Sequence, residues 1–254
     1  MPHSAYTLDA EKLAEVAKLS DRLGLALHIH AAEAPSEMAL VAAQHGTTPV
    51  RALDRAGMIR PGTLLAHAVH LDDAEIALLA ERGVAMAHCP LSNAKLASGT
   101  ARMTALRRAG VATSLGTDGA SSGNDLDMFH TMRLAAQMAI LASGQPDAMP
   151  AREVVAMATR GGARAAGLGA RKGMIARGMD ADIIVIDLSA PHLVPAYDPY
   201  STLVYAAGRS DVRQVLARGR RIVADGRPVA EISKELEMLR AVAAGIAAAA
   251  PDGS

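Results

Sequence analysis

The chain has 254 residues, half of them apolar, which is enough for one large domain or for one domain with a small appendage. A net charge of zero argues against a nucleic-acid surface or an anionic-membrane surface, and no apolar run approaches the ~20 residues of a membrane helix. The single cysteine, Cys89, excludes an internal disulfide and, with no signal-peptide pattern after Met1, predicts a cytoplasmic protein.

Helices and strands are predicted to alternate through the first two thirds of the chain. Apolar residues at helical spacing predict helices over about 9–23, 35–44, 48–56, 72–82, 101–109, 126–142 and 150–166. Short apolar runs between them predict strands over 25–30, 63–67, 84–88 and 111–118. This alternation indicates parallel strands joined by crossover helices, so the fold class is predicted to be α/β.

The pattern changes after about residue 169, where glycines separate shorter stretches. A strand is predicted over 182–187, a β-hairpin over 212–224 with its turn at Arg218-Gly219-Arg220, and a final helix over 231–249. We therefore divide the chain into an α/β domain at 1–168, a small β region at 169–230 and a C-terminal helix at 231–254.

Each of the four predicted parallel strands stops at or just before a residue that can bind a metal or carry a proton. These residues are His30, His67, His88 and Asp118. In a (β/α)₈ barrel the strand ends converge on one mouth, so residues far apart in sequence can share a site there. Imidazole and carboxylate groups are good ligands for Zn²⁺ and Fe²⁺, and a bound divalent ion lowers the pKa of a water molecule to about 7. The pattern predicts a hydrolytic metal site.

The residue types suggest distinct roles within this site. His30 is predicted to hold the metal, and Glu33, three residues later, to reach over the site and move protons. Asp118 can bind the metal and accept the proton of water, while His67 can polarise the group under attack. Each residue also has a structural alternative: a strand-end histidine, a helix N-terminal charge at Glu33, or a turn residue at Asp118. The repetition at four successive strands favours the functional interpretation.

Six short segments carry a resemblance to a known family. They are Pro-His-Ser-Ala-Tyr-Thr at 2–7, His-Ala-Ala-Glu at 30–33, Ala-His-Ala-Val-His at 66–70, His-Cys-Pro-Leu-Ser-Asn at 88–93, Gly-Thr-Asp-Gly-Ala at 116–120 and the stretch 173–187. In this order and spacing they resemble the amidohydrolase superfamily, and most of all the 5-methylthioadenosine/S-adenosylhomocysteine deaminases. Guanine, cytosine and triazine hydrolases are related groups.

The resemblance implies a fold, a cofactor and a set of site residues. The fold would be the C-terminal portion of a (β/α)₈ TIM barrel, about strands 5–8, followed by the C-terminal strands of a small β-sandwich. The cofactor would be one divalent metal, zinc or else iron, on His30 and Asp118, with Glu33, His67 and Asp118 as catalytic residues. The implied substrate contacts are His3, Glu33, His88, Asn93 and Asp118.

The chain also departs from the family pattern. The family's first strand carries a His-x-His pair that precedes the Pro-His segment, and this chain starts at that segment. His28-Ile29-His30 has the same spelling, but its position before Glu33 matches only His30 to a ligand. Ala5 stands where the family has proline, and Cys89 takes a position that is often asparagine.

These departures set the functional expectations for the chain. The complete enzyme would use water to deaminate a purine-type nucleoside or a related heterocycle, whereas this chain alone is expected to bind metal weakly and to have little or no activity. The open barrel edge predicts association, as a homo-oligomer or with an upstream fragment. Alternatives are a guanine or 8-oxoguanine deaminase, a triazine chlorohydrolase, or a non-catalytic fragment that needs a partner chain. No nucleic-acid or membrane partner is expected.

Overall fold

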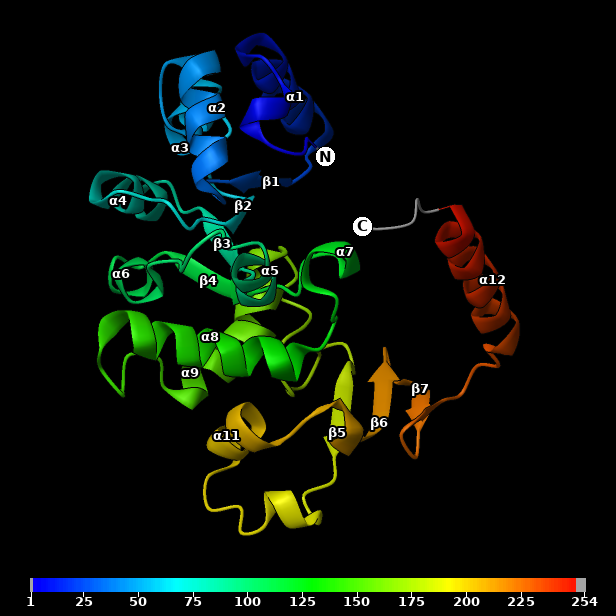
Figure 1. The fold of residues 1–254 in the computed structure, drawn as a ribbon. Helices are drawn as coiled ribbons and strands as arrows, with labels where there is room; N and C mark the ends of the chain where they lie inside the picture. The colour runs from blue at the N-terminus through cyan, green and yellow to red at the C-terminus, as the bar shows by residue number, and fades with distance from the viewer. Residues whose placement is uncertain (1, 250–254) are drawn as a thin grey trace. The chain divides into compact units, whose positions relative to one another are not determined.

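The computed structural model describes residues 2–249 (Figure 1). The chain forms two compact units: one contains residues up to Met179 together with Ser189–Arg209, and the other contains Asp180–Leu188 and the residues from Ser210 onward. The domain boundaries drawn from the sequence, at 168/169 and 230/231, remain predictions. Among residues 2–249, no helix is long and apolar enough to span a bilayer.

The first unit is built on a parallel sheet of four strands. These are β1 (Leu27–Ala31), β2 (Thr63–His67), β3 (Ala85–His88) and β4 (Ala112–Leu115), and they pair in chain order. Helices α1 to α3 lie toward the β1 end of this sheet, and α8 and α9 lie toward the β4 end (Figure 1). Parallel strands joined by helices confirm the predicted α/β class, and the assignment to barrel strands 5–8 remains a proposal.

Most helices of this unit begin and end within about two residues of their predicted bounds. Helix α1 illustrates why: the Asp9 side chain accepts a hydrogen bond from Lys12 N at its start, and Gly24 ends it with φ +61°. The helices are α1 (Ala10–Leu23), α2 (Pro35–His45), α3 (Pro49–Arg55), α4 (Asp73–Glu81), α6 (Met103–Arg108) and α8 (Met128–Ser143).

Three local predictions need correction. The strand predicted over 111–118 ends at Leu115, so Asp118 lies in the loop beyond β4 with φ +59°. Two short helices that follow strand ends were missed, α5 (Pro90–Lys95) and α7 (Ala120–Gly123). The helix predicted over 150–166 is α9 (Ala151–Ala156), a π-helical segment (Met157–Gly161) and α10 (Gly162–Ala165).

The two faces of the first strand, β1, differ in burial. Ile29, Leu65 and Met86 share one face and are at most 1% exposed. The other face carries His28 and His30, which alternate with the buried residues along β1 and are only half-buried. The histidines therefore point away from the apolar core.

The second unit contains an antiparallel sheet, as predicted for the tail. Its strands are β5 (Ile183–Ile186), β6 (Val212–Ala217), β7 (Arg220–Ala224) and β8 (Arg227–Pro228), in chain order. Arg218 and Gly219 form the turn between β6 and β7 with φ +49° and +77°. Helix α12 (Ser233–Ala249) follows this sheet in the chain.

Candidate metal and catalytic site

Residues from three strand ends converge on one point of the first unit. His30 lies on β1, His67 is the last residue of β2 and Asp118 follows β4. One ligand atom from each of them lies within 4.8 Å of the others. Two imidazole nitrogens and a carboxylate oxygen are a fitting donor set for zinc or iron. The structure thus brings together three residues that lie up to 88 positions apart, 118 minus 30.

The N-terminal segment orients His30. The backbone N–H of His30 donates to the carbonyl oxygen of His3 at 3.0 Å, and the ring Nδ1 of His30 lies 2.8 Å from the same oxygen. With the Nδ1 proton donated to a carbonyl, Nε2 is left free to bind a metal. The exposed ring of His3, a predicted substrate contact, stacks against His30 with centroids 4.6 Å apart.

Asn93 orients His67 in a similar way. Asn93 Oδ1, on helix α5, lies 2.9 Å from His67 Nδ1, and both side chains are at most 1% exposed. His67 Nε2 faces Glu33, whose Oε2 is 3.7 Å away. Asn93 was expected to contact substrate; it lies behind His67, where an amide fixes the imidazole ring. Its role in substrate binding stays a prediction.

His88 lies in the buried part of the site. Burial, with a smaller contribution from the charge of His67, lowers the pKa of His88 from 6.5 to about 4, so the ring is neutral at pH 7. Its Nδ1, together with Ser92 Oγ and Asn93 Nδ2, is a buried polar atom without a hydrogen-bond partner in the described chain. Three such atoms on one short segment suit contact with a polar ligand or with water.

Asp118 is held in its ionised form. Burial alone would raise its pKa, but the nearby Ser92 hydroxyl, the Gly119 N–H and the charges of His67 and His30 together lower it. The Gly119 N–H donates to Oδ1 at 2.7 Å, while Ser92 Oγ makes no hydrogen bond of good geometry. An ionised carboxylate at this position suits both metal binding and proton acceptance.

Glu33 lies just beyond the end of β1, as the sequence predicted. Its side chain is 22% exposed, and its carboxylate reaches toward His67. Glu37 was not predicted from the sequence; it is 4% exposed and accepts hydrogen bonds from the N–H groups of Ala32 and Glu33. Burial raises the pKa of Glu37, and these two hydrogen bonds partly offset the effect. The sequence signal for Glu37 is an acidic residue in the first turn of a helix that directly follows a loop with a candidate catalytic residue.

Two further side chains, His28 and Cys89, lie near the site. His28 faces the same side of β1 as His30, with ring centroids 6.3 Å apart, and burial followed by the charges of His30 and His67 lowers its pKa. Cys89 is 4% exposed, and burial raises the pKa of its thiol to about 12, so it packs as a small apolar residue.

Comparison with known proteins places this geometry in a family. A family model, described as the amidohydrolase family, matches residues 1–222. The chain belongs to the amidohydrolase family. The family assignment drawn from the short sequence segments is thereby confirmed.

Individual amidohydrolases match over most of this chain. A 5-methylthioadenosine/S-adenosylhomocysteine deaminase from Pelotomaculum thermopropionicum is 45% identical over 240 residues, 94% of this chain and 55% of the relative. The structure of an adenosine deaminase from Xanthomonas campestris with bound zinc superposes with a TM-score of 0.94 at 39% identity, over 97% of this chain and 56% of that one. An atrazine chlorohydrolase from Arthrobacter aurescens, complexed with zinc, gives 0.87 at 29% identity, over 92% and 52%. The chain spans about half the length of the proteins it matches.

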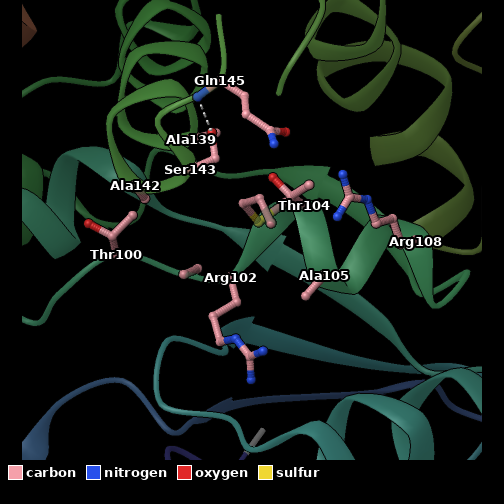
Figure 2. Close-up of a pocket in the computed structure, with 11 residues that line it drawn as sticks. Thr100, Arg102, Thr104, Ala105, Arg108, Ala139, Ala142, Ser143 and Gln145 are labelled. Atoms are coloured by element: carbon pink, nitrogen blue, oxygen red, sulfur yellow. Dashed lines mark hydrogen bonds between the residues drawn. The ribbon is translucent and has the colours of Figure 1, made fainter. Parts of the chain in front are cut away.

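A separate pocket of this amidohydrolase chain lies in the first unit (Figure 2). It has a volume of about 310 Å³ and lies beside α6 and the end of α8, where the Gln145 N–H donates to Ser143 Oγ at 3.2 Å. Its polar lining residues are Thr100, Arg102, Thr104, Arg108, Ser143 and Gln145. None of the residues that converge at the strand ends lines it, so the strand-end group remains the candidate active site.

Proposed function

We propose that this chain supplies part of the metal site, together with the proton-transferring residues, of a hydrolytic deaminase that acts on a purine-type nucleoside of the 5-methylthioadenosine/S-adenosylhomocysteine class. The observation that carries the proposal is the convergence of donor atoms from His30, His67 and Asp118 within 4.8 Å, with Glu33 3.7 Å from His67. The similarity to named deaminases supports the reaction class and the nucleoside substrate. The substrate and the activity belong to the whole protein, of which this chain spans about half the length.

The residues divide the proton transfers between them. His30 and Asp118 hold a divalent ion, for which zinc is favoured by the two zinc-containing relatives and iron is the alternative. When bound, that ion supplies Lewis acidity and lowers the pKa of a water molecule to about 7. Asp118 accepts the proton of the attacking water, since its carboxylate is ionised. Glu33 delivers a proton to a ring nitrogen, takes up the proton of the new hydroxyl group and passes it to the departing ammonia, and the proton held by Asp118 then restores Glu33.

His67 can act in two ways, depending on its protonation. Asn93 Oδ1 accepts the proton on Nδ1, so the neutral ring presents the lone pair of Nε2 and is a third metal ligand. When both ring nitrogens carry protons, Nε2 donates to the oxyanion that develops on the substrate. His3, His88 and Asn93 are proposed substrate contacts, carried over from the resemblance.

A substrate panel tests this function. The chain is assayed alone and after co-expression with the first half of the Pelotomaculum relative, which stands for the barrel strands that the resemblance places before His3. We expect ammonia release from 5-methylthioadenosine, S-adenosylhomocysteine and 5′-deoxyadenosine in the paired preparation, little release from the chain alone, and zinc in the active sample. Full activity with one tightly bound zinc in the chain alone would contradict the expected dependence on further barrel strands.

A second candidate function is hydrolysis of another heterocycle. The fold similarity to an atrazine chlorohydrolase favours it, because a chloride leaving group can depart from the same type of carbon. Guanine, 8-oxoguanine and atrazine in the same panel separate the two candidate functions. The second function predicts chloride release from atrazine, or ammonia release from guanine or 8-oxoguanine, in place of ammonia release from the nucleosides. A paired preparation that binds zinc and turns over none of these compounds would favour the remaining alternative, that this chain is a non-catalytic fragment. A cytoplasmic location remains a prediction.

A further inference from the structure

The carboxylate of Glu37 contacts the backbone next to a proposed catalytic residue. Glu37 is the third residue of α2, and its oxygens accept from Ala32 N at 3.1 Å and from Glu33 N at 2.6 Å. A glutamate at this helix position ordinarily bonds the N–H of the residue that caps the helix, as Glu75 does with Asp72 at 3.0 Å in α4. Glu37 instead accepts from Ala32 and Glu33, which precede the capping residue Ala34, and so it binds the turn that comes before its own helix.

The backbone of this turn is arranged to receive a carboxylate. Ala32 has φ +53°, in the left-handed region, which is uncommon for a residue other than glycine. This conformation turns the N–H groups of Ala32 and Glu33 to one side, and successive N–H groups in such a turn form a concave anion-binding surface. Because peptide units are planar, holding these two N–H groups also fixes the two carbonyls on the other side of units 31–32 and 32–33.

Those two carbonyls bind the loop that follows His67. The carbonyl of unit 31–32 accepts from Ala68 N at 3.1 Å, and the carbonyl of unit 32–33 accepts from Val69 N and His70 N, both at 2.9 Å. Each peptide unit is therefore held from one side by Glu37 and from the other side by the 68–70 loop. The side chains of Glu33 and His67, which these two segments carry, approach to 3.7 Å.

We propose that Glu37 is a positioning residue of this site: through two peptide units it sets the backbone of Glu33 and couples it to the loop after His67. The benefit to catalysis rests on the proposed function of Glu33, whereas the coupling between the two segments stands independently. Within the described residues, the hydrogen bonds of Glu37 go to backbone N–H groups, so it is not itself a catalytic residue.

Amide hydrogen exchange, followed by NMR on the full chain, tests the coupling. In Glu37→Ala we expect the amides of Ala32 and Glu33 to exchange about tenfold faster or more, because each loses a charged acceptor. The amides of residues 68–70 should accelerate by a similar factor, although they bond to the turn rather than to Glu37. Glu37→Gln should give a smaller acceleration, since its amide oxygen can still accept one hydrogen bond.

Glu75→Gln is the matched control, a buried acid at the same position of another helix, and it should leave the 68–70 amides unchanged. Acceleration confined to Ala32 and Glu33 would overturn the coupling. Acceleration that extends through β3 would show general destabilisation and would overturn it as well.

Kinetics of the paired preparation test the effect on catalysis. Glu37→Gln should lower kcat about tenfold and leave KM within about twofold, because a displaced Glu33 slows proton transfer without removing a substrate contact. If Glu33→Gln abolishes activity while both Glu37 variants retain the original kcat, the inference is wrong. If Glu33→Gln keeps full activity, the proposed function is wrong, and the exchange measurements still decide the coupling.

Discussion

At the scale of single residues, the site depends on a backbone carbonyl and a side-chain amide that lie outside the converging group. The His3 carbonyl and the Asn93 amide each take one nitrogen of a histidine and leave the other nitrogen facing the site. Such partners fix the ring orientation and the tautomer, and their removal typically weakens metal binding by about 10- to 100-fold. His67 and Asn93 are both fully buried, so water cannot easily replace the lost amide.

Asn93→Ala is therefore expected to weaken zinc binding about tenfold, because the His67 ring loses the acceptor that holds it. A competition titration with a chromogenic chelator measures the zinc affinity. In a His67→Ala background the same substitution should have little further effect, since there is no ring left to orient. An equal loss in both backgrounds would show that Asn93 acts elsewhere.

His88 is expected to make the fold sensitive to acid. The folded state keeps His88 neutral down to about pH 4, while the unfolded chain protonates it near 6.5, so in this interval the unfolded state binds more protons. The free energy of unfolding must then fall as the pH falls from 6.5 toward 4, by up to ~3 kcal/mol for this group. Urea denaturation of the original chain and of His88→Gln, at pH 7.5 and 4.5, measures the effect.

The glutamine variant lacks this titration, so the stability difference between the two proteins should shrink or reverse on acidification. A difference that stays constant across the two pH values would contradict the assignment of a depressed pKa to His88.

At the scale of elements, the sequence predicted the long regular parts well. Helix α1 carries a capping aspartate, apolar residues at helical spacing and a terminal glycine, which all agree. Helices α5 and α7, with six and four residues, are too short for a helical period to be visible, so they were missed. The end of β4 was misplaced because Asp118 leaves the extended conformation, which its residue type does not reveal.

The converging residues could be predicted, but the groups that orient them could not. Parallel strands bring their carboxyl ends to one edge, so the strand-end pattern indicated His30, His67, His88 and Asp118, and all of these except His88 belong to the converging group. The contact of Asn93 with His67 depends on how α5 folds back over β2, and the contact of Glu37 depends on the left-handed turn at Ala32. Both are tertiary arrangements that hydrophobic periodicity does not encode.

The π-helical segment shows how closely a helix approaches the sheet. A Cβ atom placed on Gly161 would lie 2.8 Å from the Thr113 carbonyl oxygen of β4 and 3.0 Å from that of Ala156. Gly161→Ala is therefore expected to destabilise the chain by ~1–3 kcal/mol, since backbone must shift to admit the methyl group. Gly162→Ala is the matched control: its Cβ would meet only the Met157 carbonyl at 3.5 Å, and a helical alanine is favoured over glycine by ~1 kcal/mol. Urea denaturation measures both, and equal effects would contradict the close contact.

At the scale of the whole molecule, the first unit presents an apolar groove beside the first strand of its sheet. The groove has a volume of about 410 Å³ and runs along α1 and β1. Leu19, Leu23 and Leu25 line it and are 43%, 59% and 61% exposed. Contiguous exposed apolar surface of this kind marks a contact site. Since the matched relatives are nearly twice as long as this chain, we expect the part of the relatives that this chain does not span to pack against this groove.

Replacing Leu23 and Leu25 together by lysine should then weaken pairing with the first half of the Pelotomaculum relative by about tenfold or more, because two charges would have to be buried at the contact. Size-exclusion chromatography with light scattering and a binding titration measure the pairing. Leu141→Lys is the control, because Leu141 is 82% exposed on α8 and does not line the groove. If the double variant pairs as tightly as the original chain, the groove is not the contact. If instead the original chain alone forms a dimer that the double variant abolishes, the groove binds a second copy rather than the first half of the relative.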